Sequence, residues 1–325
     1  MSPLLQICDQ WQRFEHFLLT AHANPDGDAV GSLSGLANLL VRLGKTGHIL
    51  LFEGLPVRFS WLNLPWPVVS HLPTNFEQCI VVLDCADLDR LGIDMAARLK
   101  GHELINIDHH TGNSLFGTLN WVDPGRSSVG EMIAMAARSL EMPIKGPLAE
   151  GLYLAIMADT GSLTFSNTTP QTLDVIAEIL ANGLNQDDFQ AKMQRQWSLQ
   201  KLCLHGMAMQ NVSLRANGKI GIIRATEEML DQTGAVQEDC EGLVEYVRRL
   251  RGVIVAVSLR KVKNGVKFSM RTWGEVNVQA VAAQLGGGGH PNAAGGHINT
   301  NIAQAEELVV QTITSYLTNH RDAKT

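Results

Sequence analysis

The sequence predicts an α/β protein of two domains, the first built on a parallel sheet flanked by helices and the second a smaller α/β domain. The chain has 325 residues, which is long enough for two separate cores. In its first half, short apolar runs alternate with segments whose apolar residues recur at helical spacing, a pattern typical of parallel strands joined by helices. Three of these runs end in carboxylate or imidazole side chains, at the strand ends where open α/β sheets keep their sites.

The elements of the first domain follow from this alternation. An amphipathic helix over 4–16 leads into a buried strand over 17–21, and residues 29–43 carry apolar side chains at helical spacing. Glycines then interrupt the helical pattern before a second strand over 48–52. The other predicted elements are a proline-rich irregular segment over 54–75, buried strands over 79–83 and 104–107, and a helix over 148–158.

A periodic polar–apolar segment over 187–210 lacks Gly and Pro until Gly206 and is predicted to be a helix that connects the domains. The predicted divisions are 1–190 for the first domain, 191–212 for the connecting helix and 213–325 for the second domain. The second domain is expected to contain a strand over 219–224, a helix over 239–250, a hairpin formed by 253–262 and 266–272, and a closing helix over 303–318.

Composition predicts a cytoplasmic protein without a membrane segment. Hydrophobic residues make up 45% of the chain and charged residues 18%, as in ordinary globular proteins. The N-terminus lacks the features of a signal peptide, and no stretch approaches about eighteen consecutive apolar residues. The five cysteines include no C-x-x-C pair, which fits a reducing compartment better than a disulfide framework or a zinc knuckle. The net charge of −6 disfavours a protein that coats nucleic acid nonspecifically.

The turn after the first strand concentrates coordinating side chains. His22, Asp26 and Asp28 lie within seven residues, and a proline and a glycine bend the backbone between them. Hard divalent cations prefer such oxygen ligands, and an imidazole beside them favours manganese or another transition metal over magnesium. Asp28 also has an ordinary interpretation, as the capping residue of the following helix.

Two further strands end in the same kinds of side chain. The run over 79–83 is followed by Asp84, and the run over 104–107 is followed by Asp108, His109 and His110. Each strand end alone has an ordinary explanation, because Asp often caps a following helix. Three such ends on one parallel sheet predict a common cluster at one edge. Asp159 is a fourth candidate, although taken alone it is better explained as the C-terminal turn of a helix closed by a glycine.

These blocks, in this order, resemble the DHH phosphoesterase family over most of the first 190 residues. A fifth block, Gly286 to Gly296 with His290 at its centre, resembles the signature of the accompanying DHHA1 domain. The two resemblances cover nearly the whole chain. They imply an N-terminal DHH catalytic domain and a C-terminal DHHA1 substrate-binding domain, and they imply a metal-dependent phosphodiesterase or phosphatase.

The resemblance implies two divalent cations, manganese first, with Mg²⁺ or Co²⁺ as alternatives. One ion would be held by His22, Asp26 and Asp84, and the other by Asp28, Asp84, His109 and Asp159, so that Asp84 bridges. Asp84, Asp108 and His110 are the implied catalytic residues. Asp108 would orient a ligating imidazole, and His110 would contact the substrate phosphate rather than a metal.

Substrate contacts are expected from both domains. Ser127 and Ser128 precede a helix, where they serve either as an N-cap or, as the resemblance implies, as neighbours of the scissile phosphate. The stretch from Arg248 to Arg271 contains eight basic residues and no acidic one, which is either a solvated surface or an anion-facing strand pair. Within the second domain, Arg271 and a glycine-rich loop ending in a histidine are expected to hold a phosphate or a base. The loop residues are Gly287, Gly288, Gly289 and His290.

Within the family, a chain of this size resembles the oligoribonuclease and 3′-phosphoadenosine-5′-phosphate phosphatase group. Such enzymes release nucleoside 5′-monophosphates from very short RNA or convert the bisphosphate to AMP. Aromatic residues make up only 6% of the chain, and no stacking stripe for long strands or duplexes is evident. Cleavage of pApA in a cyclic-di-AMP pathway is the alternative, and a non-catalytic nucleotide-binding regulator is disfavoured because every expected ligand position is filled. Oligomeric state stays open, with a homodimer as one option.

Overall fold

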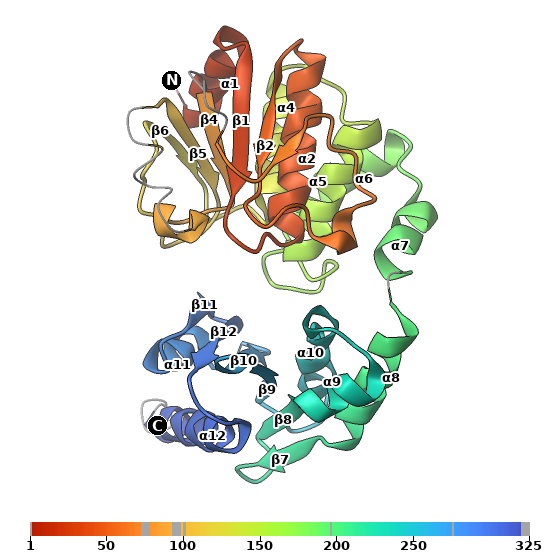
Figure 1. Cartoon of the computed structure of the whole chain (residues 1–325). Helices are drawn as coiled ribbons and strands as arrows, with labels where there is room; N and C mark the ends of the chain where they lie inside the picture. The colour runs from red at the N-terminus through yellow and green to blue at the C-terminus, as the bar shows by residue number, and fades with distance from the viewer. Residues whose placement is uncertain are drawn as a thin grey trace. The chain divides into compact units, whose positions relative to one another are not determined.

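The computed structural model describes residues 2–72, 79–92, 99, 102–195, 197–274 and 276–319. The chain forms two compact units, Met1–Gln196 and Trp197–Thr325. Each unit contains one sheet with its own hydrophobic core (Figure 1). The predicted α/β class, with a parallel first sheet and a smaller second domain, is confirmed.

The first unit is a parallel sheet in the order β3-β2-β1-β4-β5-β6. The chain runs outward from β1 to β2 and β3 on one side, then returns to place β4, β5 and β6 on the other. The order therefore reverses between β1 and β4, and such a switch point opens a crevice at the carboxyl ends of the strands. The strands are β1 (His16–Ala21), β2 (Thr46–Leu50), β3 (Val68–Val69), β4 (Cys79–Leu83), β5 (Leu104–Asp108) and β6 (Leu119–Val122).

Helices cover this sheet because its strands are apolar on both faces. Phe17 and Leu19 of β1 face a core shared with the helices, whereas Leu18 faces a smaller cluster that includes Leu91. The helical segments are α1 (Pro3–Arg13), α2 (Gly27–Arg42), η1 (Val57–Phe59), η2 (Leu88–Leu91), α4 (Val129–Ser139), α5 (Gly146–Asp159), α6 (Pro170–Ala181) and α7 (Gln186–Gln194).

Helices α2 and α5 pack backbone against backbone. A Cβ atom added at Gly31 would lie 2.5 Å from the carbonyl oxygen of Gly151, and one added at Gly151 would lie 2.7 Å from the amide nitrogen of Gly35. One turn earlier, a Cβ at Gly27 would lie 2.4 Å from the Cβ of Ala158. Only glycine permits this approach. The contact brings the first turn of α2 beside the last turn of α5.

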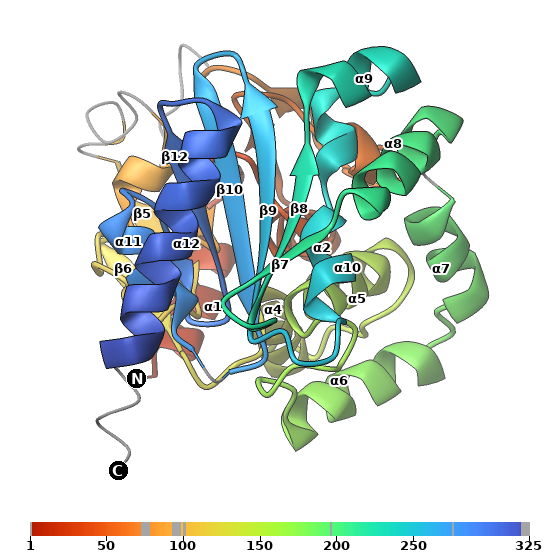
Figure 2. The same ribbon diagram turned by 90° about the horizontal axis from the view of Figure 1, so that it is seen from below.

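The second unit is a mixed sheet in the order β11-β12-β10-β9-β8-β7, and among its described strands only β8 and β9 run parallel. Helix α12 lies across β9 and β10 on one face, and α8 and α10 pack on the opposite face (Figure 2). The strands are β7 (Ser213–Arg215), β8 (Ile220–Ala225), β9 (Val255–Val262), β10 (Gly265–Thr272), β11 (Gly288–His290) and β12 (Ala293–Ile298). The helical segments are α8 (Leu199–Gln210), α9 (Glu227–Thr233), η3 (Gln237–Cys240), α10 (Leu243–Arg248), α11 (Val278–Gln284) and α12 (Ile302–Asn319).

Two predictions on the connecting region and the glycine run need correction. The single helix predicted over 187–210 is two helices, because Asn185 caps α7 and Ser198 caps α8 by accepting a hydrogen bond from the Lys201 amide. The division between the two units, at 196/197, falls within the predicted connector. The glycine run is not a loop throughout, since Gly288–His290 forms the edge strand β11. Within the described residues, no helix is both long and apolar enough to span a membrane.

Candidate metal centre

His22 and Asp26 belong to the turn that joins β1 to α2. The His22 ring donates through Nδ1 to the carbonyl of Ala23 at 2.8 Å, which leaves Nε2 facing Asp84 Oδ2 at 3.5 Å. Asp26 is the N-cap of α2, where Oδ1 accepts hydrogen bonds from the amides of Asp28 and Ala29. Its other oxygen, Oδ2, has no such role in the cap, so Asp26 can cap the helix and still face a cation.

Asp28 lies in the first turn of α2 and is not its cap, which corrects the capping interpretation of this residue. The side chain is fully buried. Oδ1 accepts from the Ser32 hydroxyl at 2.9 Å and from the Gly130 amide at 3.2 Å, and Oδ2 accepts from the Val129 amide at 2.9 Å. The last two donors are in the first turn of α4, so a helix N-terminus fixes this carboxylate in place.

Asp84 follows β4 at the centre of the cluster. Its φ angle of +54° lies in the left-handed region, which Asp tolerates better than most residues and which aims the side chain across the end of the sheet. The side chain is only 4% exposed, and Oδ1 is buried without a hydrogen-bond partner among the described residues. The nearest ring nitrogens to Oδ1 are His110 Nδ1 at 3.6 Å and His109 Nε2 at 3.8 Å. A buried carboxylate oxygen in this state calls for a cation.

The Asp108-His109-His110 segment spreads its side chains in different directions. Asp108, at the end of β5, accepts from His110 Nδ1 at 2.7 Å and from the Asn113 amide group at 2.6 Å. His109 directs Nδ1 to the carbonyl of Arg126 at 3.2 Å and Nε2 to Asp159 Oδ2 at 3.1 Å. Asp108 therefore orients His110, and a backbone carbonyl orients His109.

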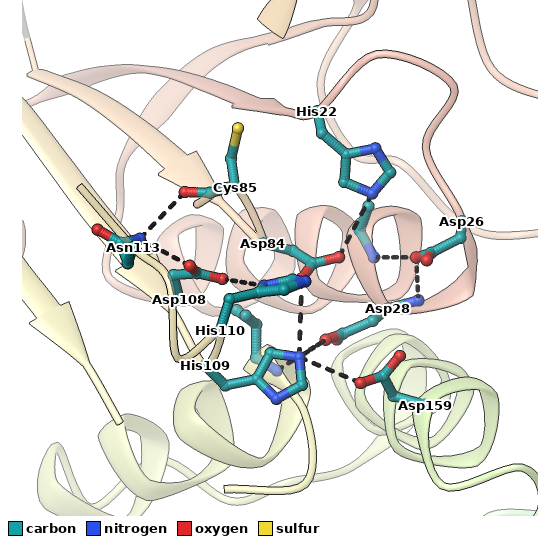
Figure 3. A network of polar contacts seen from close by, with 12 residues as sticks. His22, Asp26, Asp28, Asp84, Cys85, Asp108, His109, His110, Asn113 and Asp159 are labelled. Carbon is teal, nitrogen blue, oxygen red and sulfur yellow. Dashed lines mark hydrogen bonds and ion pairs between the residues drawn. The ribbon is translucent and has the colours of Figure 1, made fainter. Parts of the chain in front are cut away.

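Asp159 is the last residue of α5, and the glycine contact between α2 and α5 brings it to Asp28 and His109. These side chains form three overlapping sets in which the potential ligand atoms lie within 4.8 Å of one another (Figure 3). The sets are His22 with Asp26 and Asp84; Asp28 with His109 and Asp159; and Asp84 with His109 and His110. Asp84 is shared by two sets, and His109 is also shared by two.

Electrostatics test whether these residues fit cations. Burial raises the pKa of Asp28 to about 7, and the charge of Asp159 adds to this rise. Burial, with the charge of Asp28, likewise holds the pKa of Asp84 well above its usual range. Burial opposes protonation of His109, but the hydrogen bond to Asp159 and the charge of Asp28 prevail and raise its pKa to about 10. Without cations the cluster compensates its crowded negative charge by holding protons, and the donor set suits divalent ions.

Asp108 behaves differently from these carboxylates. Burial acts to raise its pKa, but the hydrogen bonds from His110 and Asn113 outweigh burial, and the pKa is lowered. Asp108 therefore stays ionised as an acceptor for His110. Sequence reasoning identified Asp108 but missed Asn113, whose type and position alone give no signal.

Ser127 and Ser128 lie at the start of α4 and are both fully buried. Ser128 is the N-cap of α4, and its hydroxyl accepts from the Glu131 amide at 3.1 Å. The Ser127 hydroxyl donates to Glu131 Oε2 at 2.7 Å, and Arg126 contacts the other oxygen of Glu131 at 3.1 Å. The capping alternative is thus correct for Ser128. Both hydroxyls serve the helix start that holds Asp28, and their contact with substrate stays a prediction.

The remaining predicted substrate residues are in the second unit. Arg271 is part of β10, where Nε lies 3.2 Å from Glu245 Oε1. Gly287, Gly288, Gly289 and His290 lead into and form β11, which pairs with β12. A Cβ at Gly287 would lie 2.2 Å from the carbonyl oxygen of Gly295, so this glycine is required by the close packing of the hairpin.

A pocket of about 350 Å³ lies beside His22. It is bordered by the β1–α2 turn, by the residues that follow β2, including Phe52, and by Leu91 and Gly92. The pocket adjoins the metal centre at the carboxyl edge of the sheet, so there is space next to the cluster for part of a small substrate.

A parallel α/β sheet that gathers cation-binding side chains at its switch point is the arrangement of a metal-dependent hydrolase. The DHH family N-terminal domain matches residues 16–156, and the DHHA1 domain matches residues 217–319. The chain belongs to the DHH phosphoesterase family, in its two-domain DHH–DHHA1 form. The resemblance predicted from the sequence motifs is therefore confirmed.

Two relatives and one solved structure show how far the similarity extends. A bifunctional oligoribonuclease and PAP phosphatase of Thermus thermophilus is 33% identical, with 92% of this chain and 90% of that protein covered. The Bacillus subtilis protein of the same description is 28% identical over 88% of this chain and 90% of its own length. A crystal structure of an exopolyphosphatase-related protein from Bacteroides fragilis shares the fold, with a TM-score of 0.88, 23% identity and coverage of 97% and 96% of the two chains.

Proposed function

We propose that this protein hydrolyses short oligoribonucleotides to nucleoside 5′-monophosphates and removes the 3′-phosphate of 3′-phosphoadenosine-5′-phosphate, using two divalent cations. One observation carries the proposal: Asp84 Oδ1 is buried without a hydrogen-bond partner in the described structure, between overlapping ligand sets. The extensive similarity to the Thermus protein, described as an oligoribonuclease and PAP phosphatase, supports the substrate class.

In this proposal His22, Asp26 and Asp84 hold one ion, and Asp28, Asp84, His109 and Asp159 hold the other. The pair of ions, with manganese proposed and magnesium or cobalt as substitutes, would neutralise the phosphoryl oxygens and lower the pKa of the attacking water. Asp84 keeps the two ligand sets together, because its two oxygens face His22 on one side and His109 on the other.

His110 is proposed to contact the substrate phosphate. The His110 ring donates through Nδ1 to Asp108, which fixes its orientation, and Nε2 is the ring atom that we propose contacts the phosphate. His110 also belongs to one of the three candidate sets, but binding a metal through Nδ1 would break its 2.7 Å hydrogen bond to Asp108. We therefore retain His110 as the phosphate contact. His110, held in place by ionised Asp108, would contact the oxyanion that develops on the phosphate.

Substrate selection is assigned to the second unit, through Arg271, His290 and the glycines before it. The guanidinium of Arg271 offers a planar pair of donors to phosphate oxygens. Ser127 and Ser128 contribute by fixing the start of α4, which positions Asp28. We further propose a cytoplasmic enzyme acting on short strands rather than on duplexes, whether as a monomer or as a homodimer.

The test is turnover of three substrates side by side with manganese: a short RNA, 3′-phosphoadenosine-5′-phosphate and pApA. We expect the RNA to yield nucleoside 5′-monophosphates and the bisphosphate to yield AMP and inorganic phosphate. A matched reaction with Asp84→Asn excludes a contaminating nuclease. Efficient cleavage of pApA alone would assign the protein to cyclic-di-AMP turnover, and inertness toward all three in the presence of manganese would refute the proposed function.

A further inference from the structure

Trp273 immediately follows β10 in the second unit, and the residue is 57% exposed. A single exposed apolar side chain is ordinary on a protein surface and by itself indicates nothing. The surroundings of this ring distinguish it, because Arg248, which is itself held in place by Glu245, fixes its orientation.

Arg248 fixes the ring in two ways. The indole Nε1–H donates to the carbonyl of Arg248 at 2.9 Å, and the guanidinium carbon of the same residue lies 4.2 Å from the ring centroid. Arg248 is only 12% exposed and lies 2.9 Å from Glu245 Oε2. One face of the indole therefore rests on a nearly buried cation, a favourable arrangement for the ring quadrupole.

Glu245 joins this assembly to the predicted phosphate contact. Its Oε2 faces Arg248, and its Oε1 lies 3.2 Å from Arg271 Nε. Burial lowers the pKa of Arg271, and the nearby negative charge of Glu245 acts in the opposite direction. The Glu245 carboxylate thus joins Arg248, which supports the Trp273 ring, and Arg271, the predicted phosphate contact, in a single network.

The strand register places these groups on one face of the sheet. Met270 and Thr272 are buried, so Arg271, which lies between them in β10, projects to the opposite side, and the contacts of Trp273 with Arg248 place its ring beside the same network. Across the sheet, Arg271 pairs with Ala293, and Ala293 pairs with His290. Directly opposed residues share a face, and the small Ala293 leaves space between Arg271 and His290.

We propose that Trp273 is a base-stacking residue: one base of a bound nucleotide lies on the outer face of the indole while a phosphate of the same nucleotide is held by Arg271. The proposal rests on the proposed function, because it takes the ligand to be a nucleotide. Stacking does not distinguish bases by hydrogen bonds, so the Trp273 ring would accept any base. A nuclease that degrades short RNA of arbitrary sequence requires such tolerance. Because the ring is already fixed, little conformational entropy is lost on binding.

The test compares two ligands that differ only in the base. Binding of 5′-AMP and of ribose 5-phosphate to the full-length, manganese-loaded protein is measured by titration calorimetry, for the wild-type protein and for Trp273→Ala, Trp273→Phe and Trp197→Ala. Trp197 is a matched control, since it is 47% exposed and has the Lys201 ammonium 5.3 Å from its ring centroid. It is not part of the network of Arg248, Glu245 and Arg271.

We expect wild-type protein to prefer 5′-AMP, and Trp273→Ala to weaken 5′-AMP binding by about 5- to 100-fold while ribose 5-phosphate binding is unchanged. Trp273→Phe should restore most of the loss, because it keeps an aromatic face, and Trp197→Ala should bind like the wild-type protein. With an RNA dinucleotide, Trp273→Ala should raise KM and leave kcat unaltered.

Three results would overturn the stacking role: equal affinity of wild-type and Trp273→Ala protein for 5′-AMP, an equal loss on both ligands, or no preference of the wild-type protein for the base-containing ligand. An equal loss on both ligands would show that Trp273 only supports Arg248 and Arg271. Failure of the proposed function is distinguishable, because wild-type protein would then turn over no nucleotide substrate even if the base-dependent binding and its loss in Trp273→Ala were found.

Discussion

Replacing Asp84 by Asn tests the central assignment with little change in shape. Asn is nearly isosteric with Asp and tolerates a positive φ angle, so the φ of +54° at this position is preserved. What changes is one negative charge, on a side chain whose two oxygens face His22 Nε2 at 3.5 Å and His109 Nε2 at 3.8 Å. Those two nitrogens belong to different ligand sets, so a single substitution affects both.

The size of the effect follows from these distances. Two unit charges about 4 Å apart interact by about 4 kcal/mol at an effective dielectric constant of about 20, which corresponds to roughly a thousandfold in affinity. We expect each cation to bind at least that much more weakly to Asp84→Asn, and kcat to fall by several orders of magnitude. At a pH high enough to ionise Asp84, the metal-free variant should melt at a higher temperature than the metal-free wild type, because a buried charge that repels Asp28 has been removed.

Metal content after dialysis, manganese titration calorimetry and thermal melts in chelator are the measurements. Asp174→Asn is the matched control, since Asp174 is exposed on α6 and should retain both metal and activity. Two ions per chain at wild-type affinity in Asp84→Asn would refute the bridging assignment. A lower melting temperature in chelator would refute the electrostatic account of the cluster.

Three further outcomes are expected. Activity lost on chelation should return with manganese far better than with calcium, because imidazole ligands disfavour an oxygen-seeking ion; hydrolysis in excess chelator would contradict a metal mechanism. Arg271→Ala should keep its metal content but lower kcat/KM for short RNA by roughly ten- to a hundredfold, and Arg271→Lys should restore only part of the lost kcat/KM. An unchanged kcat/KM in Arg271→Ala would show that Arg271 does not contact the substrate. In chelator, the free energy of unfolding should fall as pH rises from about 4 to about 10. Folding raises the pKa of Asp28 to about 7 and that of His109 to about 10. The folded protein therefore binds more protons than the unfolded chain over this range, and raising the pH favours unfolding. Added manganese should stabilise the protein more at higher pH, and melts that show the opposite pH trend would contradict these shifts.

Much of the site could be predicted because strand ends are easy to locate in this sequence. The buried run Cys79–Leu83 has the same limits in sequence and structure, and a parallel sheet necessarily brings Asp84 and Asp108 to one edge. Asp159 was harder, since it is at the end of a helix and no strand pattern locates it. The glycines that bring α5 onto α2 were a readable signal, at Gly27, Gly31 and Gly35, but their partner helix is more than a hundred residues away in the sequence.

The hydrogen bonds by which neighbouring side chains orient the site residues could not be predicted from the sequence. Asn113 and Glu131 are polar residues of ordinary types, and only the fold shows that one holds Asp108 and the other ties Ser127 to the start of α4. The glycine run was predicted to be a loop, and not in part a strand, for a related reason. A loop that exposes amides to an anion and a hairpin that packs against a neighbouring strand both require glycine, and the sequence does not separate the two requirements.

The helix crossing at Gly31 and Gly151 limits how the spacing within the metal centre can change. In most helix pairs, interlocking side chains can switch rotamer and allow the axes to slide, whereas here the main chains themselves are in contact. Asp28 lies about one turn from Gly31, and Asp159 lies about two turns from Gly151. The distance between the backbones of Asp28 and Asp159 is therefore set by the contact between the main chains. Substitutions elsewhere in the core should change this distance little. Variation in metal preference among proteins that keep this crossing should arise from ligand identity, not from widening of the gap.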